Sequence, residues 1–272
     1  MSREINKDTQ LCMSLSGRPG NFGTRFHNYL YQELGLNFIY KAFTTQDIQA
    51  AVGGVRALGI RGCAISMPFK ESCIPFLDEL DPSAKAIDSV NTIVNDAGYL
   101  RAYNTDYIAI AKLLAQYQVP PTTRFALRGS GGMAKAVTAA LRDAGFADGH
   151  IIARNEAAGK ALAAQYGYSW QPELGDLQAA MVINVTPIGM AGGAETDQLA
   201  FPPAAIDAAG IVFDVVALPA QTPLIRYGRE KGKQVITGAE VIALQALEQF
   251  VLYTGVRPTD AQVAQAAAHA RG

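Results

Sequence analysis

Short apolar segments alternate with longer helix-like stretches along most of the chain, and this alternation constrains the fold more than any other feature. Strands that alternate with helices form βαβ units, and such units build a parallel sheet. The first apolar runs and the amphipathic stretches between them are 11–16, 24–35, 37–43, 45–59 and 61–67. The sequence therefore predicts an α/β fold.

Local signals predict where several of these elements end. Gly35 follows the first helix as a C-terminal cap, and Thr45 is the expected N-cap of the second helix. Residues 89–104 read as a β-hairpin that turns at 96–98, where an Asp-Ala-Gly sequence interrupts two apolar runs.

A second series of expected strands follows a proline-rich break at 118–123. A chain of 272 residues is long enough to form two domains, so we place a domain junction near this break. The later strands are expected at 124–128, 149–155, 179–187, 210–217 and 234–238. A strongly amphipathic helix is expected directly after them, at 239–255.

Charge and composition exclude several classes of function. The 23 basic and 24 acidic residues nearly cancel, which argues against a nucleic-acid or anionic-membrane partner. The N-terminal segment lacks the apolar core of a signal peptide, and no apolar run is long enough to cross a bilayer. The three cysteines have no CxxC spacing and the three histidines are scattered. We expect a reduced, cytoplasmic protein without a metal.

A glycine cluster lies between the strand 124–128 and the helix-like stretch after it. A loop in this position allows a tight turn and lets the backbone approach a pyrophosphate at the helix N-terminus, as in dinucleotide-binding folds. A purely structural glycine turn is the alternative. The candidate cofactor-binding residues of the loop are Gly129, Ser130, Gly131, Gly132, Met133 and Ala134.

The end of the next strand carries Arg154 and Asn155. Chains that bind NAD usually present an acidic residue here to the ribose 2′-hydroxyl, whereas a cation favours the 2′-phosphate of NADP. We therefore expect NADP(H) in preference to NAD(H). A solvated arginine at a strand end is the alternative reading of Arg154.

Five short segments occur in a fixed order around the glycine loop. Three precede it: SMPFKE at 66–71, SVNTI at 89–93 and YNTD at 103–106. INVTPIGM at 183–190 and ALQAL at 243–247 follow it. This set resembles the shikimate dehydrogenase family over nearly the whole chain. The N-terminal loop described below looks like that of the divergent shikimate dehydrogenase-like branch.

The resemblance implies an N-terminal α/β substrate-binding and catalytic domain at 1–106, completed by a terminal helix that returns to it within 239–272. It implies a C-terminal Rossmann NADP-binding domain at 107–238. The implied reaction is the reversible, NADP-dependent reduction of 3-dehydroshikimate to shikimate or of a related cyclic hydroxy acid.

The resemblance also assigns residues to this reaction. Lys70 and Asp106 are the implied catalytic pair: an ammonium stabilises the alkoxide formed by hydride transfer and donates a proton, and a carboxylate orients the lysine and substrate. Substrate binding is implied for Ser66, Asn91 and Gln245. Further cofactor contacts are implied for Thr186, Pro187, Met190, Val215 and Gly238.

The departures from the family concern the substrate more than the cofactor. A Ser-x-Ser pair that binds the ring carboxylate in the family corresponds to Asn21 and Gly23 within the loop 17–25. Asn21 and Thr24 are the remaining candidate donors. Ala64 and Ala217 stand where the family has an asparagine and a tyrosine. Loss of hydrogen bonds to a charged group, worth about 1.5–3 kcal/mol each, puts shikimate itself in question.

The adenine side of the expected cofactor site is also altered. Ala153 and Ala158 replace polar or basic residues, and Lys160 is a candidate substitute. Two alternatives to the leading hypothesis stay open: a dehydrogenase for a different small alcohol, and a non-catalytic protein that senses NADP(H) or a metabolite. The presence of both Lys70 and Asp106 argues against the second. The expected partner is a small molecule, and the sequence is compatible with a monomer or a homodimer.

Overall fold

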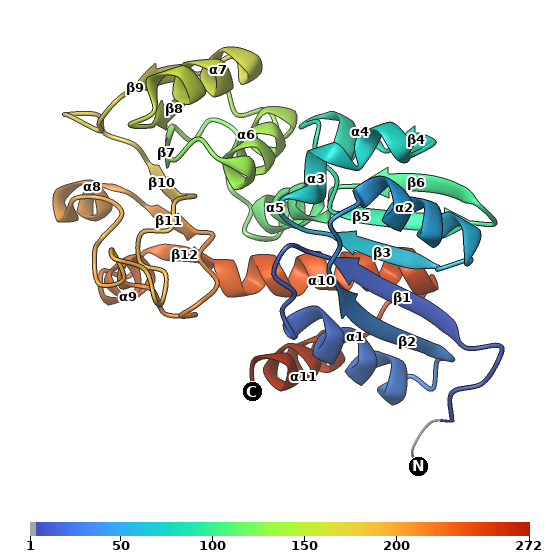
Figure 1. Cartoon of the computed structure of the whole chain (residues 1–272). Helices are drawn as coiled ribbons and strands as arrows, with labels where there is room; N and C mark the ends of the chain where they lie inside the picture. The colour runs from blue at the N-terminus through green and yellow to red at the C-terminus, as the bar shows by residue number, and fades with distance from the viewer. Residues whose placement is uncertain (1–3) are drawn as a thin grey trace. The chain divides into compact units, whose positions relative to one another are not determined.

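The computed structural model describes residues 4–272, so residues 1–3, where the expected first domain begins, lie outside the description. The chain forms two compact units (Figure 1). Unit 1 comprises the chain up to Thr105 together with Ala243–Gly272, and unit 2 comprises Asp106–Ile242.

Unit 1 contains a mixed sheet, which has six strands within the described part of the chain. β5 runs antiparallel to both of its neighbours, and the other pairs are parallel. In spatial order the strands are β2 (Phe38–Phe43), β1 (Gln10–Leu15), β3 (Gly62–Ile65), β5 (Thr92–Asp96), β6 (Tyr99–Tyr103) and β4 (Glu79–Leu80).

Helices cover both faces of this sheet (Figure 1). On one face Val52 and Val55 of α2 (Ile48–Ala57) pack with Leu15 and Ile65. The other face packs against α1 (Phe22–Glu33), α10 (Gly238–Thr254) and α11 (Asp260–Arg271). The short helices α3 (Phe69–Ser72), η1 (Ile74–Phe76) and α4 (Pro82–Lys85) lie in the connections between β3 and β5.

Unit 2 contains a parallel sheet with the strand order of a Rossmann fold. That order is β12 (Gln234–Thr237), β11 (Ile211–Asp214), β10 (Met181–Asn184), β7 (Phe125–Arg128), β8 (Gly149–Ile152) and β9 (Ser169–Gln171). Its helices are α5 (Thr105–Gln116), whose first residue closes unit 1, α6 (Gly132–Asp143), α7 (Glu156–Tyr166), α8 (Pro203–Ala208) and α9 (Pro223–Glu230). The α/β fold class with a Rossmann sheet is confirmed.

The boundaries of the elements correct one prediction. The hairpin of β5 and β6 turns at 96–98 as expected, and Gly35 follows α1 with a φ of +63°. Thr45 is not the N-cap of α2, because Asp47 takes that role and accepts a bond from the Ala50 N–H at 2.9 Å. The Thr45 hydroxyl instead accepts the Asp47 N–H at 3.0 Å, in a turn that precedes the helix.

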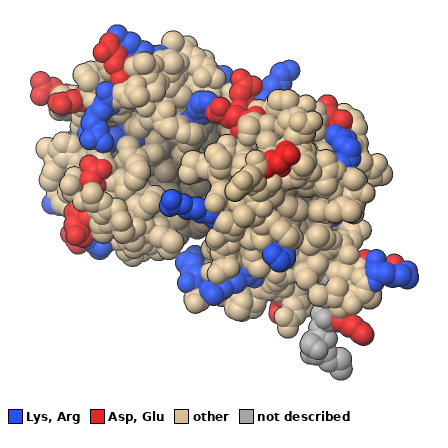
Figure 2. Space-filling model, viewed as in Figure 1, with Lys and Arg blue, Asp and Glu red and all other residues tan. Residues whose placement is uncertain are grey.

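Charge is distributed without a dominant sign on the face that Figure 2 shows, where basic and acidic side chains are interspersed among neutral ones. Across residues 4–272, no helix has both the length and the apolar character needed to cross a membrane. The histidine, cysteine and acidic side chains of these same residues form no group of three suited to a metal ion.

The three cysteines lie in the interior of unit 1 as free thiols. Cys12 belongs to β1 and Cys63 to β3, whereas Cys73 directly follows α3. Burial raises the pKa of Cys12 and of Cys73 to about 12, and raises that of Cys63 further. At neutral pH all three are protonated thiols that act as small apolar side chains.

His27 of α1 is a fully buried histidine in an aromatic environment. Its ring stacks on Tyr40 with the centroids 4.5 Å apart and lies near Phe250. Neither ring nitrogen makes a hydrogen bond within the described chain, and burial lowers the pKa of His27 to about 3. The imidazole therefore stays neutral in the folded protein at every ordinary pH.

This burial predicts that acid weakens the fold. Between pH 6.5 and 3 the unfolded chain protonates His27 and the folded protein does not, so the free energy of unfolding falls as the pH falls, by up to about 1.4 kcal/mol per pH unit. Urea titrations from pH 7 to pH 4 should show a shallower decline for His27→Phe than for the wild type. His269→Gln, in α11, is the control that should keep the wild-type slope, and parallel slopes for all three would contradict this account.

Candidate functional site

A buried polar network lies at one edge of the unit 1 sheet, and Asn91 is at its centre. The side-chain oxygen of Asn91 accepts three hydrogen bonds: from the Thr105 N–H at 2.7 Å, the Thr105 hydroxyl at 3.0 Å and the Thr92 hydroxyl at 2.8 Å. Asn91, Thr92 and Thr105 are all buried. These bonds leave the Asn91 amide nitrogen as the group that can donate to a ligand.

Two glutamines of α10 complete this network. Gln245 donates to the Thr105 hydroxyl at 3.1 Å. Gln249 donates to the Thr92 hydroxyl at 2.9 Å and to the Asn91 carbonyl at 3.1 Å. Residues four apart lie on one side of a helix, so a single face of α10 presents both amides to the sheet.

Lys70 and Asp106 are each connected to this network through the backbone. Lys70 lies half-buried in α3, and its carbonyl accepts the Val90 N–H at 2.8 Å, one residue before Asn91. Asp106 lies in the first turn of α5, directly after Thr105. Asp106 is the first residue of unit 2, whereas the sequence placed it as the last residue of the first domain. Ser66 is exposed between β3 and α3.

The loop between β1 and α1 is held against the segment that leads to Lys70. The Gly17 N–H donates to the Met67 carbonyl at 2.9 Å, and a Cβ on Gly17 would lie 3.1 Å from the Pro68 ring. Asn21 is the exposed N-cap of α1 and makes no capping bond with its side chain. Thr24 lines a separate pocket between α1 and His269 of α11, which none of Ser66, Asn91 and Gln245 lines.

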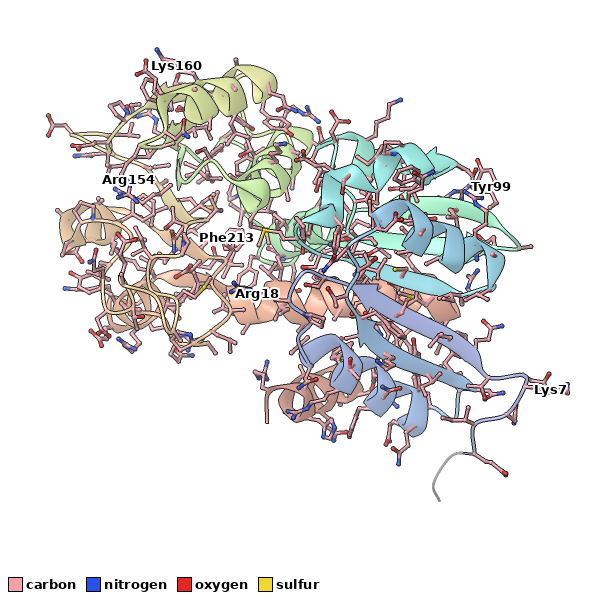
Figure 3. All side chains as sticks on the ribbon, in the orientation of Figure 1. Lys7, Arg18, Tyr99, Arg154, Lys160 and Phe213 are labelled. Carbon is pink, nitrogen blue, oxygen red and sulfur yellow. The ribbon has the colours of Figure 1, made fainter. Side chains whose placement is uncertain are left out.

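Arg18 is a cation of this loop that the sequence analysis did not single out (Figure 3). Its N–H is held by the Ser16 hydroxyl at 3.1 Å, and its side chain is exposed. Within residues 4–272 the Arg18 guanidinium forms no ion pair. The signal that the sequence offered for this residue was a basic side chain between the two glycines of the loop Gly17-Arg18-Pro19-Gly20.

In unit 2 the glycine loop connects β7 to α6. Gly129 has a φ of +127°, and a Cβ there would lie 2.7 Å from Val185, so this position requires glycine. Nothing lies within 4 Å of a Cβ built on Gly131 or Gly132. The backbone at these two glycines is therefore open to a ligand at the N-terminus of α6.

A pocket of about 270 Å³ opens beside this loop. The lining is formed by 128–130 at the end of β7, 152–155 at the end of β8, Pro172, and 186–188 after β10. The carboxyl ends of β7 and β10 flank the point where the strand order reverses, which is where Rossmann folds bind nucleotides. Small-molecule sites span about 300–1,000 Å³, so this pocket matches part of a dinucleotide rather than all of it.

A buried carboxylate organises the loops that follow β10 and β11. Asp214 accepts the Thr222 hydroxyl at 2.6 Å, the Asn184 amide at 3.0 Å and the Val216 N–H at 3.0 Å. Asn184 in turn accepts the Thr186 hydroxyl at 2.6 Å. Burial raises the pKa of Asp214 to about 6, although the three hydrogen bonds oppose this rise.

Comparison with known proteins places the chain in a family. A family model of the shikimate dehydrogenase substrate binding domain matches residues 22–93. A shikimate dehydrogenase-like protein of Haemophilus influenzae is 65% identical over 267 residues, which are 98% of this chain and 98% of that protein. The chain belongs to the shikimate dehydrogenase family. The resemblance drawn from the ordered motifs is thereby confirmed.

Solved structures of family members superpose over nearly the whole chain. A shikimate 5-dehydrogenase-like protein that is 64% identical has a TM-score of 0.98, over 99% of this chain and 100% of that one. The shikimate 5-dehydrogenase of Thermus thermophilus, solved in complex with NADP(H) and shikimate, is 27% identical. Its TM-score is 0.84, over 96% of this chain and 99% of that one.

The structure separates the expected family residues into groups. Asn91 and Gln245 share the network of unit 1, and Gly129, Ser130, Arg154, Asn155, Thr186 and Pro187 share the pocket of unit 2. Met190 is exposed beyond that pocket, on the loop whose Ala191 N–H donates to the Leu218 carbonyl at 2.9 Å. A Cβ on Gly238 would lie 2.4 Å from the Val215 carbonyl oxygen, so packing against the backbone requires glycine at that family position.

Lys160 does not take part in the pocket. It pairs with Glu156 at 2.6 Å and lies over the Trp170 ring at 5.0 Å, on the outer side of α7 and apart from Arg154 (Figure 3). The sequence analysis also missed Thr105, Gln249 and Asp214. For Gln249 the available signal was its spacing of four residues from Gln245. No local signal marks Asp214, since its partners are distant in the sequence.

The raised pKa of Asp214 predicts a pH-dependent stability. Between pH 3.8 and 6 the folded protein holds a proton that the unfolded chain releases, so the stabilising contribution of this group is lost as the pH rises, by about 3 kcal/mol in total. Asp214→Asn should therefore gain stability relative to the wild type between pH 4 and pH 7 in urea titrations. The exposed Asp197→Asn is the control, and an equal pH profile in wild type and Asp214→Asn would refute the shift.

Proposed function

We propose that this protein is an NADP-dependent dehydrogenase that reversibly reduces a cyclic keto acid to the hydroxy acid, with 3-dehydroshikimate and shikimate as the reference pair. Membership of the shikimate dehydrogenase family supports the reaction class. The Thermus thermophilus relative, solved with NADP(H) and shikimate, supports this choice of cofactor and reference substrate.

The observation that carries this proposal is the Asn91 network. The Asn91 oxygen fixes Thr105, which directly precedes Asp106, and the Lys70 carbonyl bonds to the residue before Asn91. Residues from four of the five family segments are thus tied together through backbone and side-chain bonds. A fold that did not use these residues would have no need to bury four hydrogen-bonded polar side chains, Asn91, Thr92, Thr105 and Gln249, beside the partly buried Gln245.

Lys70 and Asp106 are the proposed proton-transfer pair. During reduction, the Lys70 ammonium stabilises the negative charge that develops on the substrate oxygen and donates a proton to it. Asp106 accepts a hydrogen bond from the substrate hydroxyl and supports the charge on Lys70. In the oxidative direction the neutral Lys70 amine removes the hydroxyl proton. The Asn91 amide and Gln245 orient the ring.

The unit 2 pocket fits the nucleotide end of NADP(H). Gly129 lets the backbone turn without a side chain, and Arg154 and Asn155 line the pocket where a ribose with a 2′-phosphate is expected. When bound, the nicotinamide cofactor supplies or accepts the hydride. Thr186 and Met190 follow β10, whose last residue Asn184 bonds to both Thr186 and Asp214, and they would contact the nicotinamide.

Arg18 supports an acidic substrate. The Gly17 N–H of its loop donates to the Met67 carbonyl, three residues before Lys70, so the cation is anchored to the same connection that carries Lys70. An arginine fork binds a carboxylate through two parallel hydrogen bonds. Arg18 thereby offers the carboxylate recognition that the loop lacks at Asn21 and Gly23.

A dehydrogenase for a different, less hydroxylated substrate is the second candidate. Ala64 and Ala217 offer no polar side-chain atoms, and the neighbouring Leu218 is 61% exposed. Spectrophotometric assays of shikimate, quinate and less hydroxylated acids or alcohols with NADP⁺ and NAD⁺ distinguish the two candidates. Binding of NADPH without turnover of any of these compounds would favour a sensing protein instead.

The assignment of Lys70 predicts a loss of chemistry without a loss of cofactor binding. Lys70→Ala should lower the rate of hydride transfer by roughly 10²- to 10⁴-fold, the usual contribution of a general acid or base. The dissociation constant of NADPH should stay within about twofold, because Lys70 belongs to unit 1. Lys85→Ala, on the exposed side of α4, is the matched control. Equal losses of NADPH affinity and turnover would show that Lys70 binds the cofactor.

The assignment of Arg18 predicts an effect on substrate binding. Arg18→Ala should raise the KM for a carboxylate substrate by about tenfold or more, with kcat much less affected, because a charge-assisted bond present in both ground and transition states is lost. Arg18→Lys should recover part of this loss. Arg25→Ala, an exposed change in α1, should leave KM unchanged. A KM that is insensitive to Arg18 would remove it from the substrate site.

A further inference from the structure

Arg128, the last residue of β7, is a half-buried cation that forms no ion pair within residues 4–272. Its Nε is buried and makes no hydrogen bond in the described chain, and its guanidinium lies over the Phe201 ring at 5.3 Å. Glu173 and Glu195 are close enough to influence it, yet neither forms an ion pair with it. A guanidinium carries five donors, and a buried one is normally paired.

Arg128 lies at the carboxyl end of β7, beside the nucleotide pocket. Arg128 lines that pocket together with Arg154, which also forms no ion pair among residues 4–272. In the sheet Arg128 is the register partner of Ile152, two residues before Arg154. Arg128 at the end of β7 and Arg154 just after β8 therefore line one small cavity.

Without a bound anion, the positive charges of Arg128 and Arg154 repel each other. Burial lowers the pKa of Arg128, and repulsion from Arg154 lowers it further. Two like charges that line one pocket, one of them partly desolvated, weaken the fold unless an anion binds between them. Lys160 does not share this role, because it is engaged by Glu156 and Trp170.

We propose that Arg128 and Arg154 form a two-arginine site for a phosphate monoester, the 2′-phosphate of the adenosine ribose, and that Arg128 is a determinant of NADP(H) specificity. This inference rests on the proposed use of a nicotinamide dinucleotide. A phosphate monoester carries a charge of about −1.5 to −2 at pH 7, whereas each pyrophosphate group carries about one negative charge. A dianion matches two guanidinium groups, and Arg128 offers it donors that the protein itself leaves unused.

The pyrophosphate is the other anionic group that Arg128 could reach, since Gly129 and Ser130 follow it directly. The two sources make different predictions, because NADH and 5′-AMP lack the 2′-phosphate. If Arg128 contacts the 2′-phosphate, its substitution weakens the binding of NADPH and 2′,5′-ADP alone. If Arg128 contacts the pyrophosphate or adenine, its substitution weakens the binding of NADPH and NADH equally.

The test measures nucleotide affinity by calorimetry with the full-length protein and no substrate. Arg128→Met keeps the side-chain length and the packing on Phe201, and should weaken NADPH and 2′,5′-ADP by roughly 10- to 100-fold, the loss expected for charge-assisted bonds. NADH and 5′-AMP should change by less than about twofold. Arg154→Ala should show the same selectivity. Arg124→Met, at the other end of β7 where Arg124 pairs with Asp148, should change none of the four.

Thermal unfolding without nucleotide gives a second measurement. Arg128→Met should unfold at the same temperature as the wild type or higher, since it removes a desolvated and repelled charge, and NADPH should stabilise it less than it stabilises the wild type. If Arg128→Met fails to fold, Arg128→Lys takes its place. Arg128→Lys keeps the charge but loses the planar fork, and should weaken 2′,5′-ADP several-fold with 5′-AMP unchanged.

Two results would overturn the assignment. Equal weakening of NADPH and NADH would place Arg128 on the pyrophosphate or adenine, and unchanged affinity for all four nucleotides would make it a structural residue. Failure of the proposed dehydrogenase function looks different: turnover is absent with every substrate, while the selective loss of 2′-phosphate binding in Arg128→Met persists.

Discussion

The side-chain oxygen of Asn91 is the acceptor on which the organisation of unit 1 depends. It receives three hydrogen bonds among buried side chains, so its loss would leave two hydroxyls and one backbone N–H without this acceptor. Through Thr105 it sets the start of α5, and through the backbone of Val90 it is linked to α3. Asn91 and its neighbour Val90 are thus bonded to the backbone of Lys70 and to Thr105, directly before Asp106, although they belong to neither α3 nor α5.

Asp214 has a comparable role in unit 2. It lies at the carboxyl end of β11, and its two oxygens bring together the loop after β10 and the loop that leads to α9. In both units, a buried polar side chain at a strand end converts the regular geometry of a sheet into a defined arrangement of irregular loops. The two groups differ in charge: Asn91 is neutral at every pH, whereas burial of Asp214 raises its pKa and makes these loops of unit 2 sensitive to acidity.

The sequence was sufficient for the fold class because its signals are local. Alternating apolar runs and the glycine loop after 124–128 depend on neighbouring residues, and they predict the Rossmann sheet correctly. Thr45 was wrong as a cap because Asp47, two residues later, competes for the same role and wins. The interactions of Gln249, Asp214 and Arg128 join residues that are distant in the sequence, so only the folded chain reveals them. Helix α11 was not expected, since its alanine-rich sequence carries little amphipathic pattern.

The burial of all three cysteines has a practical consequence for spectroscopy. With their pKa values raised to about 12 or beyond, Cys12, Cys63 and Cys73 hold almost no thiolate at neutral pH and react slowly with maleimides or iodoacetamides. One cysteine introduced on the surface of each unit would then be the preferred point of attachment for a fluorophore or spin label. The native chain is therefore a ready background for measuring the separation of its two units with and without nucleotide.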